Sequence, residues 1–308
     1  MDILHKIIYI PQALTIQNIA GVIAKLNTFK NSDENNIVIS FSHTLHATPS
    51  ALTSLLCYLR ELPKHKTGFQ GIIVHSNNKE TDTLIAKMGF YNLLGISDNF
   101  DLNKEQTKIS KELYCFNSNT PEEEVINLNE KIIYNFTKQS KNDNYKKAIS
   151  WCIPELVDNA RTHSKARECV LFAQKHPRGH FTEFCIADCG IGIQKTMGDD
   201  DIVSALTRCI KQEKGIHSKG MGNGLYFTSE LIKNDKSKAK SYLNIYSGDA
   251  MLQVNSGQLP QIIQQDAYWQ GTIVTLVVSD EIESSIEHIK GAEVELTEDL
   301  PNFYFEET

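Results

Sequence analysis

Two glycine-rich segments of this 308-residue chain carry residues whose types and spacing suit the binding of a small molecule. In the first, Asp188 ends an apolar run and is followed by Gly190 and Gly192, which permit close approach between backbone and ligand. The carboxylate is positioned there to accept a hydrogen bond from an amine on a flat ligand. The second segment, KGMGNGL at 219–225, opens directly into a helical pattern. Free amides at that helix start form an anion site suited to phosphates.

A polar face precedes these segments on an expected helix over 144–163. Glu155, Asn159 and His163 are four residues apart, so they lie along one side of that helix. Pro154 is expected to kink the helix or to start a new segment, because proline removes a backbone donor. Such a face is also typical of an exposed helix, so its meaning depends on the segments that follow it.

The elements that must position Asp188 are a pair of expected strands, 168–174 and 180–188, joined by a turn at 177–179. Neither glycine segment is a Walker A loop or a Rossmann fingerprint, because the required Gly-Lys-Ser/Thr and the βαβ unit are missing. The three aspartates at 199–201 are expected to cap and begin a helix over 202–211.

The order of these segments resembles the Bergerat-fold (GHKL) ATPases. The likeness rests on ELVDNARTHS, DCGIGI and GMGNGLYFTSELI, followed by a Gly-Thr pair that enters the strand IVTLVV, and it spans about 145–279. The family includes DNA gyrase, the heat-shock chaperone ATPase, sensor histidine kinases, the mismatch-repair ATPase and anti-sigma serine kinases. The resemblance implies a two-layer α/β sandwich in which helices cover a mixed sheet.

The resemblance also implies a site for ATP and Mg²⁺. Asn159 would hold the metal ion that bridges the phosphates, and Glu155 would orient and deprotonate the attacking water. Asp188 would bind the adenine amino group, and Thr272 would support that contact. His163 would touch phosphate or brace its helix, and Gly190 and Gly192 would let the backbone wrap the nucleotide. A lid of about 194–221 would close over the phosphates. The implied phosphate contacts in and after this lid are Lys219, Gly220, Gly222, Asn223, Gly224 and Leu225.

The first hundred residues alternate strand-like and helix-like segments, which indicates an α/β layer. Strands are expected over 3–10, 36–42 and 70–76, and helices over 14–26, 50–62 and 80–88. The stretch 36–94 resembles the sulphate-transporter and anti-sigma-antagonist (STAS) domain. In that family a serine in the turn before the helix that corresponds to 50–62 can be phosphorylated. Here Thr48 or Ser50 is either such an acceptor or the N-cap of the helix.

These patterns predict α/β and α+β architecture in four regions. A STAS-like domain is expected over 1–102 and a linker with a connecting helix over 103–143, the polar stretch 103–119 lacking periodicity. The Bergerat-fold domain is expected over 144–279, and an acidic tail over 280–308. From residue 279 to the end there are ten acidic residues and one basic residue.

Composition excludes several other classes. The seven cysteines lack CxxC pairing and are expected to be reduced core thiols. No apolar run approaches the roughly 20 residues of a membrane span, and the N-terminus lacks a signal-type core, so a cytoplasmic protein is expected. The net charge of −7 gives no basic footprint for nucleic acid.

Three functions remain open. The first is Mg²⁺-dependent ATP hydrolysis that acts as a conformational switch, and the second is a serine/threonine kinase of the anti-sigma type in a partner-switching system. The third is an ATP-dependent sensor or interaction module without hydrolysis. A protein partner or a homodimer is expected, and the STAS-like segment favours the kinase because such domains are partners of those kinases. Histidine autokinase activity is not expected, because 121–149 contains no histidine.

Overall fold

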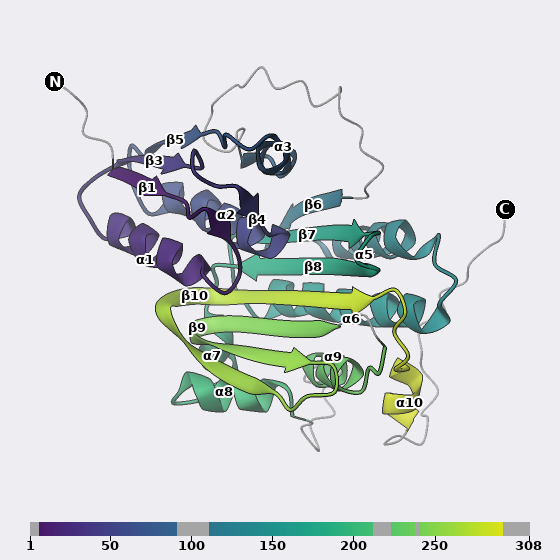
Figure 1. Cartoon of the computed structure of the whole chain (residues 1–308). Helices are drawn as coiled ribbons and strands as arrows, with labels where there is room; N and C mark the ends of the chain where they lie inside the picture. The colour runs from purple at the N-terminus through teal and green to yellow at the C-terminus, as the bar shows by residue number, and fades with distance from the viewer. Residues whose placement is uncertain (1–5, 91–110, 212–222, 238–240, 292–308) are drawn as a thin grey trace.

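The computed structural model describes residues 6–90, 111–211, 223–237 and 241–291 (Figure 1). In the N-terminal part, residues 6–90, the elements are β1 (Lys6–Tyr9), β2 (Ala13–Leu14), α1 (Ile19–Lys30), β3 (Asn36–Ser40), β4 (His46–Ala47), α2 (Pro49–Glu61), a 3-10 turn (Leu62–Lys64), β5 (Gln70–Val74) and α3 (Lys79–Lys87). From residue 111 onward they are β6 (Lys111–Phe116), α5 (Glu122–Thr137), α6 (Asp143–Thr162), β7 (Cys169–His176), β8 (Phe181–Asp188), α7 (Gly192–Met197), α8 (Ile202–Cys209), α9 (Gly224–Lys233), β9 (Tyr242–Asn255), β10 (Gln261–Ser279) and α10 (Ile286–Gly291).

Two main sheets of different type organise the chain. In the N-terminal part, β1, β3 and β5 form a parallel sheet with β3 in the middle, and β2 pairs with β4. The second sheet has the order β6-β7-β8-β10-β9, and all of its pairings are antiparallel. The predicted α/β and α+β class is therefore confirmed, with parallel and antiparallel pairing in separate sheets rather than mixed within the second one.

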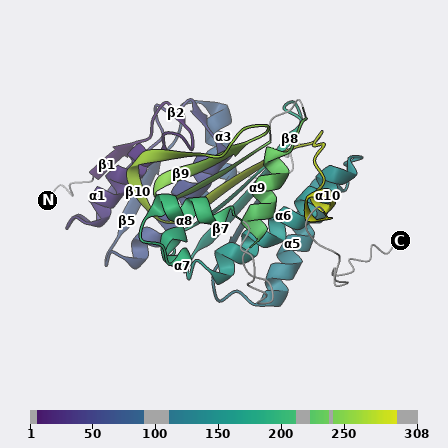
Figure 2. The same ribbon diagram turned by 90° about the horizontal axis from the view of Figure 1, so that it is seen from below.

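Helices cover both faces of the five-stranded sheet. On one face α2 packs against β7 and β8, and α1 packs against β10. On the other face α6 and α9 cover the sheet, and α5 packs outside α6. Figure 2 shows the N-terminal helices and the α6–α9 layer on opposite sides of the long strands. The helices α1 and α2 thus lie between the two sheets.

The apolar runs of β7 and β8 explain why both faces are covered. Val170 and Phe172 on β7 belong to the same core as α1 and α2, whereas Leu171 and Ala173 face the core that includes α6. All four side chains are buried. Successive side chains of a strand point to opposite faces, so a continuous apolar run is stable only where both faces of the sheet are covered from solvent.

The start of α2 shows which residue caps this helix. Thr48 is the N-cap, and its hydroxyl accepts a hydrogen bond from the amide of Ala51 at 3.4 Å. The N-cap prediction is thereby confirmed. Ser50 is buried, and its amide donates to the carboxylate Oε1 of Glu183 on β8 at 3.2 Å. The first turn of α2 is therefore already neutralised by an acid from the other sheet.

Two expected boundaries differ from the structure in the middle of the chain. Residues 111–116, expected to be linker, form the edge strand β6, which pairs with β7; residues 103–110 lie outside the described part. A new segment starting at Pro154 is also absent, because α6 is one helix from Asp143 to Thr162. Packing against the sheet and α5 holds this helix together across the proline, in agreement with the weight of tertiary contacts in helix stability.

The acidic C-terminal region is docked where the structure describes it. The side-chain amide of Asn142, the N-cap of α6, donates to the carbonyl oxygens of Asp280 and Ile282 at 3.1 and 3.0 Å. The helix α10 then packs against α9 and α6. Residues 280–291 of the expected acidic tail therefore pack against the rest of the chain, and 292–308 lie outside the described residues.

Across residues 6–90, 111–211, 223–237 and 241–291, no helix combines the length and apolar character needed to cross a bilayer.

Candidate functional site

A cavity of about 360 Å³ opens between α6, the end of β8, the interior of β10, and the helices α7, α8 and α9. This volume lies within the range of small-molecule sites, roughly 300–1,000 Å³. The predicted site residues that line it are Asn159, His163, Asp188, Gly224, Leu225 and Thr272. Residues from four separate sequence segments are therefore brought to one space.

Asp188 lies at the end of β8, where only 3% of its surface is exposed. The amide of Gly190 donates to its Oδ1 at 2.8 Å, and the backbone of Thr272, opposite Asp188 in the β8–β10 ladder, supplies a second hydrogen bond. Burial nevertheless dominates and raises the pKa of the Asp188 carboxyl to about 7. The cavity thus contains a carboxyl group that is nearly isoenergetic between its charged and neutral forms at neutral pH.

The glycines after Asp188 have a structural role that the sequence interpretation did not assign to them. A Cβ on Gly190 would collide with the carbonyl oxygen of Ser164, and Gly192 has a φ of 77°. Neither glycine lines the cavity. They allow the loop to fold back on the protein and so present Asp188, and the expectation that they wrap the ligand is not supported by their position.

Glu155 lies beside the start of α9 rather than in the wall of the cavity. A Cβ on Gly224 would collide with the carboxylate oxygen Oε2 of Glu155, so the two residues are in contact. Gly224 itself lines the cavity and is the first residue of α9. The carboxylate is therefore next to the backbone amides at the N-terminus of that helix.

The remaining walls combine apolar side chains with one cation. The apolar lining consists of Leu156, Ala160, Ile186, Ile193, Met197, Leu225 and Val274. Arg208 on α8 also lines the cavity, and its guanidinium donates to Asp199 Oδ1 at 2.5 Å. The sequence interpretation missed Arg208; its only signal was a basic residue in the last turn of a helix, which is a common arrangement. The cavity therefore has an apolar part and a guanidinium group that is paired with Asp199.

Part of the predicted phosphate segment is not described. Lys219, Gly220 and Gly222 lie outside the described residues, as does 212–221 of the expected lid. Its first section contains α7 and α8. Asn223 is the N-cap of α9, and within the described part of the chain its buried Oδ1 has no hydrogen-bond partner.

The oxygen atoms at the cavity suit a hard cation that is held partly by the protein and partly by the phosphates of a bound substrate. Magnesium prefers oxygen ligands and is usually bound by one or two protein oxygens together with substrate phosphates and water. Asn159 supplies an amide oxygen at the cavity wall. The described residues contain no cluster of three or more His, Cys, Asp or Glu side chains that would hold a metal by themselves.

Comparison with known proteins adds no assignment to this geometry. No protein-family model matches the chain, and no curated protein matches its sequence.

Proposed function

We propose that this protein binds ATP with Mg²⁺ in the cavity at the end of β8 and hydrolyses it. The observation that carries the proposal is the buried Asp188 carboxyl in an apolar cavity whose other end is formed by the start of α9. A purine base and a charged phosphate chain need these two environments.

The adenine end is argued from hydrogen-bond chemistry. In its ionised form the Asp188 carboxyl can only accept hydrogen bonds, and the exocyclic amine of adenine donates them. Guanine carries a carbonyl oxygen at the same ring position, which would face the Asp188 carboxylate as a second acceptor. The apolar walls, including Ile186 and Val274, accommodate the faces of the ring. This arrangement favours adenine over guanine.

The phosphate end is argued from charge. The first amides of α9, at Gly224 and Leu225, border the cavity and provide the partial positive charge of a helix N-terminus. Arg208 adds a guanidinium group, which also binds Asp199. Asn159 would hold Mg²⁺ against the phosphates through its amide oxygen. The three features together oppose the charge of a triphosphate.

Hydrolysis is supported by the position of Glu155. Its carboxylate contacts Gly224, at the helix end where the phosphates would lie. A carboxylate within reach of that region can accept the proton of an attacking water. Closure and opening around the nucleotide would then act as the conformational switch.

Transfer to a serine or threonine is the alternative outcome for the same nucleotide. The N-terminal part offers Thr48 and Ser50, but Thr48 caps α2 and Ser50 is buried against Glu183. The observed packing therefore favours water over these two hydroxyls as acceptor, and a kinase activity would need a separate protein substrate.

The proposal is tested with the full chain by calorimetry and with γ-labelled ATP. ATP with Mg²⁺ should bind at least tenfold more tightly than GTP, and label should appear as free phosphate.

Asp188→Asn should remove the preference for ATP over GTP, whereas Asp266→Asn, which removes a charge from an exposed position, should leave it unchanged. Glu155→Gln should retain ATP and stop phosphate release. Absence of binding heat with ATP would refute the site, and label on protein would identify a kinase.

A further inference from the structure

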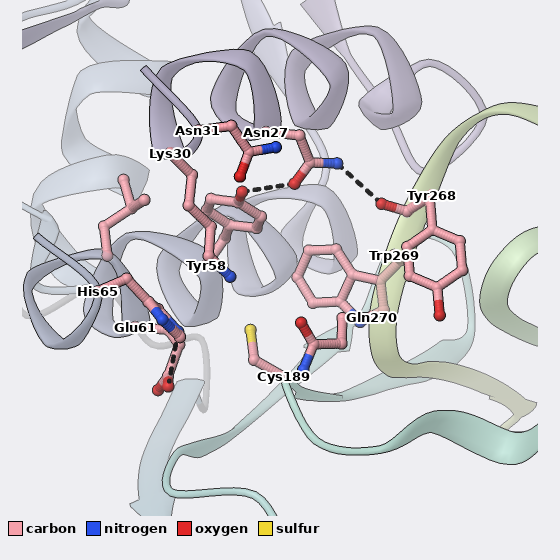
Figure 3. Close-up of a pocket in the computed structure, with 11 residues that line it drawn as sticks. Asn27, Lys30, Asn31, Tyr58, Glu61, His65, Cys189, Tyr268, Trp269 and Gln270 are labelled. Carbon is pink, nitrogen blue, oxygen red and sulfur yellow. Dashed lines mark hydrogen bonds and ion pairs between the residues drawn. The ribbon is translucent and has the colours of Figure 1, made fainter. Parts of the chain in front are cut away.

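A second cavity, of about 320 Å³, lies between the N-terminal part and the corner of β10 (Figure 3). Its walls come from α1, α2, Cys189 and the segment 268–270. Asn27 joins the two sides, because its side-chain amide donates to the carbonyl oxygen of Tyr268 at 3.0 Å and its Oδ1 accepts from the Tyr58 hydroxyl at 2.6 Å. This cavity is separate from the proposed nucleotide site, which lies across the sheet.

Two cysteines are in contact beside this cavity, and one of them lines it. The Sγ atom of Cys57, on α2, is 3.7 Å from the Sγ atom of Cys189, which follows β8. Cys57 is fully buried, whereas Cys189 is partly exposed and lines the cavity. Figure 3 shows the Cys189 sulfur directed toward the space between Tyr58 and Trp269. A small molecule in the cavity therefore reaches Cys189 before Cys57.

The environment of Cys57 distinguishes the two thiols further. The hydrogen bond with Cys189, followed by burial, raises the pKa of the Cys57 thiol well above its ordinary value. Since the thiolate is the reactive form, Cys57 is a poor first nucleophile toward a dissolved oxidant. It is nevertheless in contact with Cys189, which is the position required of a thiol that resolves an oxidised partner.

We propose that Cys57 and Cys189 form a peroxide-sensitive modification site that closes to an intramolecular disulfide. The Cys189 thiolate attacks one oxygen of hydrogen peroxide, which breaks the O–O bond, gives a sulfenic acid and releases hydroxide. The Cys57 sulfur then attacks the Cys189 sulfur, and the sulfenic hydroxyl leaves with the Cys57 proton as water. Two thiols lose two electrons and one peroxide is reduced to two waters.

This bond would connect segments 132 residues apart in the chain. It would tie the middle of α2 to the residue that follows Asp188. The same corner is already held by Trp269, whose indole Nε1 donates to the carbonyl oxygen of Asp188 at 2.9 Å. The disulfide therefore fixes the N-terminal part to the loop of the five-stranded sheet that carries Asp188.

The test is peptide mapping of the full-length, nucleotide-free protein after exposure to hydrogen peroxide and alkylation under denaturing conditions. Trypsin should yield the peptide 31–60, which contains Cys57, linked to the peptide 179–195. The second peptide also contains Cys185, so fragmentation must place the link at Cys189. The mass of the two linked peptides should appear as hydrogen peroxide is titrated into the protein, and it should disappear on treatment with dithiothreitol.

Matched variants make the result decisive. Cys57→Ser should let Cys189 stop at the sulfenic acid, which dimedone traps, and Cys189→Ser should abolish the link without sulfenic acid at Cys57. Cys115→Ser removes a cysteine that is exposed on β6 and should leave the link unchanged.

In the wild type, oxidation should raise the unfolding midpoint by several degrees, and dithiothreitol should reverse this increase. A link through Cys185, or Cys189 oxidised while Cys57 remains a free thiol, would overturn the proposal. None of these readouts requires that the protein bind ATP.

Discussion

Replacement of Asp188 by asparagine should stabilise the protein at alkaline pH and much less at acidic pH. The pKa of the carboxyl is about 7 in the folded chain, against about 3.9 for an aspartate in an unfolded chain. Between these values the folded chain holds one more proton, so the free energy of unfolding falls as pH rises and the loss is complete above pH 7. At about 1.4 kcal/mol per pH unit, the total loss is about 4 kcal/mol.

The asparagine that replaces Asp188 does not titrate, so the variant avoids this loss. By pH 5 the wild type has lost about a third of the total, which leaves about two thirds, or about 3 kcal/mol, to be lost between pH 5 and pH 8. The stability difference between Asp188→Asn and wild type should therefore change by about 3 kcal/mol, in favour of the variant at pH 8. A hydrogen bond lost from Gly190 or Thr272 would lower both values equally and cancel in this comparison.

Urea unfolding followed by circular dichroism, at both pH values and for both proteins, measures this difference. Asp266→Asn is the control, because it removes one negative charge from an exposed position. An advantage of Asp188→Asn that is the same at pH 5 and pH 8, or a pH-dependent gain of equal size in Asp266→Asn, would refute the argument that burial destabilises the charged form of Asp188.

Three further predictions concern the loop and the cavity. Gly192→Ala should lower the free energy of unfolding by about 1–2 kcal/mol in urea titrations, because φ is 77° there and an added Cβ would approach the Gln270 carbonyl oxygen at 2.7 Å; no loss would show that the loop shifts freely. Trp269→Phe should cost about 1–3 kcal/mol by the same measurement, since the buried Asp188 carbonyl loses its indole donor, and a neutral effect would contradict that. Arg208→Ala should weaken calorimetric binding of ATP at least tenfold but change adenosine binding little; equal weakening of both would place Arg208 away from the phosphates.

The sequence was informative where a local rule decides the structure. Thr48 followed by proline predicts the start of a helix, and Asp201 caps α8 through the amide of Ser204 at 2.9 Å, as such a residue should. The β7–β8 hairpin was found because its strands are apolar and its turn contains Pro177 and Gly179. The resemblance to the Bergerat-fold ATPases implied that Asn159, Asp188, Gly224 and Thr272 share one site, and all four line the same cavity.

The features that the sequence did not predict depend on contacts between residues that are distant in the chain. The edge strand β6 is short and exists because it pairs with β7, so its own six residues gave no signal. The closeness of Gly190 to Ser164 could not be inferred from either segment, which is why the glycine was assigned to the ligand. The contact between Cys57 and Cys189 is of the same kind, since neither residue has a local pattern that indicates the other.

The double coverage of the five-stranded sheet has a consequence for work with fragments. Val170, Phe172, Cys185 and Ala187 share one core with α1 and α2. A fragment that begins at residue 111 would leave these side chains, together with Trp269, without cover on that face. Water would then meet a broad apolar surface, which commonly leads to aggregation. Residues 6–90 and the five-stranded sheet therefore share one core, and a fragment meant to stay folded should keep the two together.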